Sequence, residues 1–184
     1  MSKVIAALRL VAIVTVLFVS VPAWADFRGE VVRILDGDTI EVLVNRQPIR
    51  VRLADIDAPE SGQAFGSRAR QRLADLIFRS EVQVIEKEID RYGRTLGIVY
   101  ASLKYPGGEV QLTNINAIMV QEGMAWAYRY FNKPTDPDMY ELEKEARRQK
   151  VGIWLDGNAQ EPWQWRREQN KPRARLTQWR ISHD

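Results

Sequence analysis

Residues 29–56 read GEVVRILDGDTIEVLVNRQPIRVRLADI, and this stretch contains three strand-like segments in immediate succession. The segments are rich in valine, isoleucine and leucine, which favour β-structure. A DGD turn separates the first pair and an NR turn the second, and both are credible hairpin connections. The stretch therefore predicts an antiparallel meander, with strands over 29–35, 39–44 and 47–56.

The remainder of the chain predicts two more strands and three helices. One helix is expected where Ala69, Leu73 and Ile77 share a face, and helical spacing returns at Ile115 and Met119. Five short strands with a helix inserted after the third predict an α+β fold: an OB-type five-stranded Greek-key β-barrel with three packed α-helices. The further strands are expected over 82–88 and 95–101, and the helices over 67–78, 112–123 and 135–149.

The N-terminus has the pattern of an export signal. Lys3 and Arg9 precede an apolar run over 10–21, and an AWA motif ending at Ala25 fits a small-x-small cleavage site. An uncleaved membrane anchor is the alternative, but the run is shorter than the roughly 20 residues that a spanning helix needs. We therefore expect a cleaved signal peptide over 1–25 and an exported protein, periplasmic or secreted, without stable membrane association.

The chain ends in a basic extension, residues 161–184, in which six basic residues accompany three acidic ones. Trp163, Trp165 and Trp179 are interleaved with these charges. Such a segment suits a polyanion such as nucleic acid, and a solvated terminus is the alternative. A length of 184 residues favours one folded domain, which is expected over 26–160 and as a monomer.

Three charged motifs fall in turns that can converge at one end of the barrel. DGDT (36–39) lies in the first turn, RLADIDAPE (52–60) runs off the third strand, and DRYGR (90–94) joins the last two strands. Together they supply two carboxylates of the metal-binding type, one further carboxylate and two arginines. Any one of these motifs could be structural, but the combination points to a shared site.

Phosphodiester cleavage is the chemistry that needs this set. Attack of water on a phosphodiester builds negative charge on the non-bridging oxygens, which arginine forks can stabilise. A metal held by carboxylates polarises the phosphoryl group and acidifies a bound water, and a further carboxylate can accept the proton. Oxygen-only ligation favours Ca²⁺ or Mg²⁺, and calcium is the better expectation for an exported protein.

Missing residue types narrow the chemistry further. The sequence has no cysteine, which excludes disulfides, thiol nucleophiles and cysteine metal sites. Its one histidine is His183, next to the C-terminus, so neither a histidine base nor a Ser–His hydrolase is expected. The sequence also has no GxxxxGK[ST] phosphate loop. Catalysis by carboxylates and arginines remains.

DGDT, RLADIDAPE, DRYGR and LTNINAIMVQEGMAWAYRY resemble the motifs of the staphylococcal nuclease (thermonuclease) family, in the same order and at similar spacing. The resemblance covers residues 28–158. It implies an OB-type barrel with three helices. It also implies calcium-dependent hydrolysis of DNA and RNA that leaves 3′-phosphate ends.

The resemblance also implies how the carboxylates divide their roles. Asp38 and Asp57 would bind one calcium ion, or less readily magnesium, together with the backbone carbonyl of Ala58. Glu60 would act as the general base or orient the attacking water.

The same resemblance implies roles for two arginines and three tyrosines. Arg52 and Arg94 would grip the phosphate and stabilise the transition state. Tyr92, Tyr128 and Tyr130 would line the nucleotide pocket.

Strand alternation sets a geometric condition on this site. In an ideal strand, Arg52 and Asp57 point to opposite faces. Both can serve one site only if the strand twists, bulges or ends before Asp57, and Pro59 favours such an end. Asp55 shares the parity of Asp57 but matches no family position, so we expect it to be structural or to add a minor charge behind the site.

Two other classes of function remain as alternatives. A non-catalytic extracytoplasmic nucleic-acid-binding OB-fold module would use aromatic side chains and a basic groove, but it would not need the full set of carboxylates and arginines. An anchored structural calcium protein would explain the aspartates and leave both arginines without a role. The joint presence of the five charged residues favours the enzyme.

Overall fold

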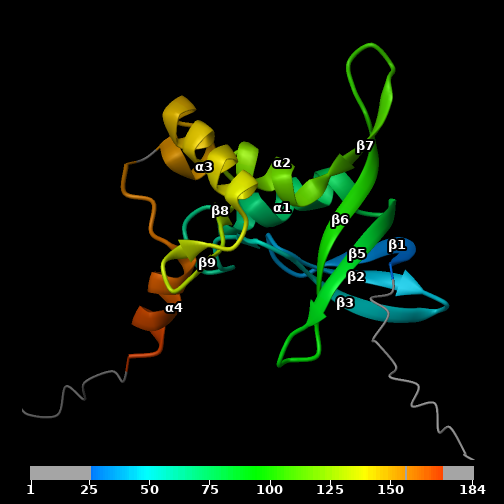
Figure 1. The fold of residues 1–184 in the computed structure, drawn as a ribbon, viewed down its shortest axis with the longest axis horizontal. Coiled ribbons are helices and arrows are strands. Elements are labelled where there is room, and N and C mark those ends of the chain that lie inside the picture. Colours follow the sequence, from blue (N-terminus) through cyan, green and yellow to red (C-terminus); the bar gives the residue numbers. More distant parts are fainter. Residues whose placement is uncertain (1–25, 156, 172–184) are drawn as a thin grey trace, which may run out of the picture.

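Five strands close into a barrel within the residues that the structure, a computed structural model, describes: 26–155 and 157–171. Neighbouring strands follow the order β3-β2-β1-β5-β6, and parallel pairing of β3 with β6 closes the ring (Figure 1). The predicted α+β class and OB-type five-stranded barrel are confirmed. The barrel strands are β1 (Phe27–Ile34), β2 (Thr39–Val44), β3 (Gln47–Leu53), β5 (Glu81–Ile89) and β6 (Thr95–Lys104).

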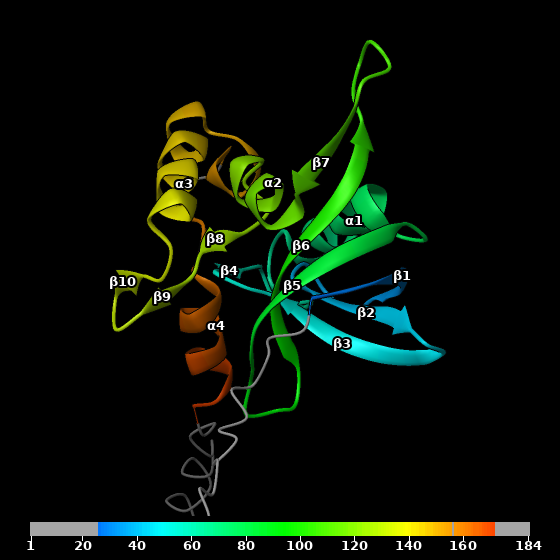
Figure 2. The same ribbon diagram turned by 45° about the vertical axis from the view of Figure 1, so that its right-hand side comes forward.

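Three helices pack together on one side of the barrel, and a further helix near the C-terminus lies below them (Figure 2). The first helix buries Ala69, Leu73 and Ile77, the face predicted from the sequence. The third begins after Asp136, whose side chain accepts hydrogen bonds from two backbone N–H groups of the first turn. In chain order the helices are α1 (Gly66–Ile77), α2 (Ile115–Gln121), α3 (Pro137–Gln149) and α4 (Pro162–Gln169), with a short 3₁₀ helix η1 (Gly152–Leu155) before the last.

Several boundaries differ from the prediction. Strand β3 ends at Leu53 rather than at residue 56. The helix expected over 112–123 begins at Ile115, because the preceding residues form β7 (Val110–Asn114), which pairs with β6 in a hairpin that projects from the barrel (Figure 1). Asn114 ends that strand and caps α2 by accepting a hydrogen bond from the third residue of the helix. Helix α4 is additional to the three predicted and lies in the basic extension.

Two short ribbons connect the barrel to the helices. Strand β4 (Ile56–Asp57) pairs with β8 (Trp126–Ala127), and β9 (Arg129–Tyr130) pairs with β10 (Lys133–Pro134). The first ribbon draws the chain after β3 away from the barrel wall and toward α3. This detour carries the RLADIDAPE motif.

The core fills the barrel and continues beneath the helices. Valines of the barrel strands pack against aliphatic side chains of α1 and α2, which places one continuous apolar region between the two layers. The fully buried members of this core include Val31, Ile40, Val42, Val51, Leu53, Val84, Val99, Leu73, Ile77, Ile115 and Met119.

Asn116 joins the two layers by polar contacts. Its side-chain oxygen accepts a hydrogen bond from the backbone N–H of Val99 (3.0 Å), and its amide group donates to the carbonyls of Ala54 (2.9 Å) and Gly97 (3.2 Å). Asn116 is fully buried, so these bonds take the place of the hydrogen bonds that its side chain would make to water. They fix the turn that follows β3 against α2.

Parts of the sequence-based interpretation lie outside the described residues. These parts are the signal peptide at 1–25 and residues 172–184 of the basic extension, which include Trp179 and His183. Across the ranges that are described, no helix combines the length and apolar character needed to cross a membrane.

Candidate active site

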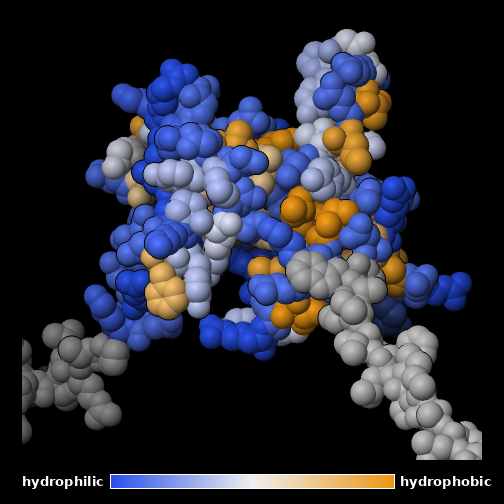
Figure 3. Space-filling model, in the orientation of Figure 1, coloured by the Kyte–Doolittle hydropathy of each residue, from blue (hydrophilic) through white to orange (hydrophobic). Residues whose placement is uncertain are grey.

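An open cleft of about 1310 Å³ lies where the β1–β2 turn, the end of β3 and the β5–β6 turn meet. Eight of the nine predicted site residues line it. The ninth, Asp57, is fully buried and bonded to side chains that line the cleft. On the face seen in Figure 3, the surface is hollowed between α4 and the β5–β6 side of the barrel, among mostly hydrophilic side chains. The three motifs therefore converge as the sequence predicted.

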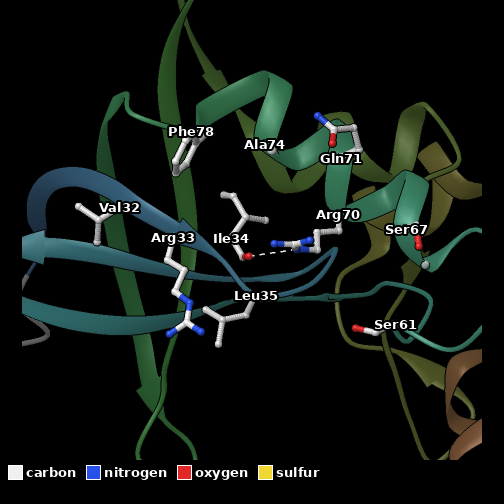
Figure 4. Close-up of a pocket in the computed structure, with 11 residues that line it drawn as sticks. Val32, Arg33, Ile34, Leu35, Ser61, Ser67, Arg70, Gln71, Ala74 and Phe78 are labelled. Carbon is white, nitrogen blue, oxygen red and sulfur yellow. Dashed lines mark hydrogen bonds between the residues drawn. The ribbon is translucent and has the colours of Figure 1, made fainter.

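A second pocket, of about 520 Å³, lies between β1 and α1 (Figure 4). Arg70 reaches into it and donates a hydrogen bond from Nε to the carbonyl of Ile34 at 3.1 Å. None of the residues lining this pocket carries a carboxylate. It lacks the donors for the predicted chemistry, so the larger cleft is the candidate site.

Asp38 is held just before β2 by five hydrogen bonds, one of which its backbone carbonyl accepts from the N–H of Leu53 (2.8 Å). Its own N–H donates to Asp36, while its Oδ1 accepts from the hydroxyl of Thr39 (2.9 Å) and from Arg52 (2.9 Å). Its Oδ2 accepts from the backbone N–H of Ala58 at 3.0 Å. Burial raises the pKa of Asp38, and the charge of Arg52 opposes that shift. This carboxylate therefore depends on positive charge nearby.

Arg52 binds both aspartates with one guanidinium group. Its Nη1 lies 2.9 Å from Oδ1 of Asp38, and its Nη2 lies 2.8 Å from Oδ1 of Asp57. Burial opposes the charged form of Arg52, but the two carboxylates outweigh it and raise its pKa. The two aspartates are thus close enough to share a single cationic group.

Asp55 provides the break in alternation that this geometry requires. Its φ angle of 61° lies in the left-handed region, between the end of β3 and the start of β4. The reversal turns Asp57 toward the side on which Arg52 lies, although an uninterrupted strand would separate them. Lys87 pairs with the Asp55 carboxylate, and the backbone N–H of Tyr128 donates to its carbonyl at 2.8 Å. Asp55 thus holds the turn in place.

Glu60 lies in a tight loop that leads into α1. Its N–H donates to the side chain of Gln63 (3.1 Å), and its carbonyl accepts from the N–H of Gln63 (2.8 Å). Gly66 packs directly on this carbonyl, because a Cβ atom there would lie 2.0 Å from the oxygen. These contacts fix the backbone from which the Glu60 side chain projects.

Arg94 lines the cleft but is paired within its own turn. Its Nε donates to Asp90 at 2.7 Å, and the other oxygen of Asp90 accepts from the backbone N–H groups of Tyr92 and Arg94. Desolvation acts to raise the pKa of Asp90, but the hydrogen bonds from Arg94 outweigh it and lower that pKa. The DRYGR turn is therefore preorganised, and the guanidinium of Arg94 lines the cleft while paired with Asp90 rather than with Asp38 or Asp57.

The three predicted tyrosines all line the cleft. Tyr92 and Tyr130 are 69% and 64% exposed, respectively, and Tyr128 is half-buried. The guanidinium of Arg94 lies 5.5 Å from the centre of the Tyr92 ring. Exposed rings beside arginines form a surface on which unpaired bases can stack.

Helix α4 brings Trp163, Arg166 and Arg167 to the cleft, and the sequence analysis assigned none of them to the site. The Arg166 guanidinium contacts Asp57 (2.7 Å) and Glu60 (2.5 Å), and Trp163 lines the cleft. The sequence offered two interpretations of this basic extension, and neither placed it on the carboxylates. Pro162 was the available signal, because proline favours the first turn of a helix.

The donor set fits a hard cation in charge and in ligand type. Asp38, Asp57 and Glu60 carry three negative charges, and Arg52 neutralises one of them. Arg166 pairs with Asp57 and Glu60, but the charge of the three carboxylates exceeds that of Arg52 by two, and such oxygen donors suit a divalent ion such as Ca²⁺ or Mg²⁺. Within 26–155 and 157–171, no three His, Cys, Asp or Glu side chains cluster as a preformed metal site, so other oxygen donors would complete the coordination. The N–H of Ala58, rather than its carbonyl, is the group that contacts Asp38.

A family model and several known proteins are similar to this chain. A family model described as "Staphylococcal nuclease homologue" matches residues 50–156. The micrococcal nuclease of Shigella flexneri is 81% identical over 167 residues, covering 91% of this chain and 96% of its own length. Protein ParB of Escherichia coli is 58% identical over 168 residues, covering 91% and 95%. An uncharacterized endonuclease of Escherichia coli O157:H7 is 46% identical over 142 residues, covering 77% and 86%.

The bridge made by Arg52 predicts a large effect on stability. Substitution Arg52→Met leaves the buried Asp38 carboxylate without a charged partner and leaves Asp57 with Arg166 alone. We therefore expect the free energy of unfolding to fall by about 3–5 kcal/mol. Arg94→Met is the control, because its pair with Asp90 lies in a surface turn and contributes about 1 kcal/mol. Urea unfolding of both variants at neutral pH measures the difference. Equal losses would contradict the role assigned to the bridge.

Proposed function

The chain belongs to the staphylococcal nuclease family and is a nuclease, and from that premise we propose that it is a calcium-dependent endonuclease that hydrolyses DNA and RNA and leaves 3′-phosphate ends. The observation that carries the proposal is one guanidinium, that of Arg52, bound to two buried carboxylates in the cleft that Glu60 and Arg94 also line. Nucleic acid is the substrate class for this activity.

The two arginines would act on the charge that develops during cleavage. A phosphodiester in the cleft would lie within the reach of Arg94 at one edge, with Arg52 at its floor. Fixed guanidinium groups stabilise the additional negative charge of the transition state without having to reorganise. This role is supported by the hydrogen bonds that hold both side chains before any substrate binds.

Glu60 would accept a proton from the attacking water or orient that water. A carboxylate is suited to this role when it lies beside the reacting phosphate and its backbone is rigid, and the loop contacts with Gln63 and Gly66 provide that rigidity. Asp38 and Asp57, with the Ala58 carbonyl, would hold one cation. Bound there, the cation would polarise the phosphoryl group and acidify water.

The aromatic side chains would position the nucleotides. Tyr92, Tyr128 and Tyr130 surround the cleft, and stacking on such rings tolerates any base. A sequence-tolerant nuclease that accepts both DNA and RNA is consistent with this surface. A non-catalytic nucleic-acid-binding module would also use these rings, but it has no need of Glu60 beside two carboxylates and an arginine.

We also propose that the protein acts outside the cytoplasm, as a monomer without stable membrane association. The basic, apolar and small-residue pattern of residues 1–25 supports export to the periplasm or the medium. An extracytoplasmic location favours calcium over magnesium as the cation. N-terminal sequencing of the exported protein should begin at Asp26, and an intact N-terminus would contradict cleavage.

Removal of the Glu60 carboxylate should impair the chemical step. For Glu60→Gln we expect turnover on plasmid DNA and on RNA to fall by about a hundredfold or more, because the proton acceptor is lost. Glu88→Gln is the matched control, since Glu88 is an exposed carboxylate that lines the same cleft. Initial cleavage rates measure both, and a Glu60→Gln variant with nearly normal turnover would refute the role.

Removal of the cation should abolish cleavage. In excess chelator we expect no detectable plasmid or RNA digestion, and we expect added Ca²⁺ to restore it more fully than added Mg²⁺. The ends of the products, tested with a phosphatase-dependent ligation assay, should carry 3′-phosphates. Undiminished digestion in chelator would rule out the proposed cation, while full recovery with Mg²⁺ alone would correct its identity.

A further inference from the structure

Arg166, in helix α4, contacts two of the carboxylates at the candidate site directly. Its Nη2 lies 2.7 Å from Oδ2 of Asp57, and its Nη1 lies 3.2 Å from Oδ1 of the same carboxylate. The same Nη1 lies 2.5 Å from Oε1 of Glu60. One planar guanidinium thus binds a proposed cation ligand at both oxygens and the proposed base at one.

These contacts engage the carboxylate oxygens that a cation would need. Arg52 already takes Oδ1 of Asp57, and Arg166 takes Oδ2, so neither oxygen of this fully buried group is free. The fork of Arg166 faces the carboxylates rather than the open part of the cleft, where a phosphate would lie. Its position is therefore that of a counter-ion and not that of a phosphate ligand.

The charges allow an exchange between the guanidinium and a cation. The three carboxylates of Asp38, Asp57 and Glu60 carry two more negative charges than Arg52 neutralises. Arg166 neutralises only one of these two charges. Burial opposes the charged form of Arg166, but its hydrogen bond to Asp57 leads the effects that raise its pKa, so it stays charged. A divalent ion would neutralise both of the charges that Arg52 leaves, and its positive charge would repel Arg166 from the same oxygens.

Apart from the ion pairs of Arg166, few contacts attach helix α4 to the domain, and one of them is the guanidinium of Arg129, which lies 5.6 Å from the centre of the Trp163 ring. Among its described side chains, Pro162 is the buried one, and the Arg166 side chain is 37% exposed. The ring of Trp165 packs over Gly62, and the carbonyl of Gln160, just before the helix, accepts a hydrogen bond from Gln63. In both views the helix lies apart from the packed trio α1–α3 (Figures 1 and 2). Its release would leave the barrel and its core intact.

We propose that Arg166 is an internal competitor of the divalent cation, which binds only after α4 withdraws this guanidinium from Asp57 and Glu60. The inference rests on the proposed function in one respect, namely that these carboxylates take a cation. It adds a closed state in which the proposed base is paired and the cation ligands are occupied by the chain itself. The apparent affinity for the cation is then lowered by the fraction of molecules in the open state.

Calcium affinity measured by titration calorimetry on the purified protein tests the competition directly. Arg166→Gln keeps the length and hydrogen-bonding capacity of the side chain but removes its charge, and we expect it to bind Ca²⁺ about tenfold more tightly than the unaltered protein. This factor corresponds to a closed state that holds about nine molecules in ten. Arg167→Gln is the control, because it removes the same charge from an exposed neighbour on the same helix, and we expect its affinity to change less than twofold.

A second measurement uses the unaltered protein. If calcium displaces Arg166, amide hydrogen exchange over residues 162–169 should become faster when saturating Ca²⁺ is added, while exchange in the barrel strands slows or stays constant. Slower or unchanged exchange in α4 on calcium binding would overturn the proposal. Equal affinities of the two glutamine variants, or weaker binding by Arg166→Gln, would overturn it as well. Absence of calcium binding by every form would instead overturn the cation assignment on which the proposal rests.

Discussion

The active-site end of the barrel depends on the charge of one buried guanidinium group. Arg52 pairs with Thr39 across the β2–β3 ladder, which brings it beside Asp38, and it reaches Asp57 beyond the end of its own strand. Three groups that would each be costly to bury alone are stabilised together by their hydrogen bonds, and Arg166 supplies the second positive charge that balances the two aspartates. The left-handed turn at Asp55, held by Asn116 and Lys87, is the backbone solution that makes this match possible.

Local sequence patterns were sufficient to predict most of the fold. Alternating aliphatic residues and short polar turns identified the barrel strands, and the spacing of Ala69, Leu73 and Ile77 identified the face of α1. The errors came from pairings that local patterns do not encode. Residues 112–114 have a helix-like neighbourhood, but they pair with β6 in a hairpin, and tertiary pairing overrides local preference. Strand β3 ends early because β4 pairs with β8, nearly seventy residues away in the sequence.

The same distinction explains the candidate site. The residues of the three turns were predictable because each motif supplies its own geometry, as the DRYGR turn does for Arg94 through Asp90. Arg166 was not predictable, because its contact with Asp57 joins residues 109 positions apart. A basic segment with tryptophans has many possible partners, and a sequence carries no local signal for choosing among them. The structure resolves that choice in favour of the carboxylates.

The absence of a side chain at Gly66 is required by the loop that carries Glu60. Because its Cα packs on the carbonyl of Glu60, any side chain at this position must push the loop that carries the carboxylate. Helix α1 could accept alanine there by propensity alone, and such a change would leave the barrel core untouched. Its cost would fall on the loop that carries Glu60, the proposed base, because that loop or the start of the helix must shift to make room. A position that bears no functional group of its own therefore helps to place the carboxylate.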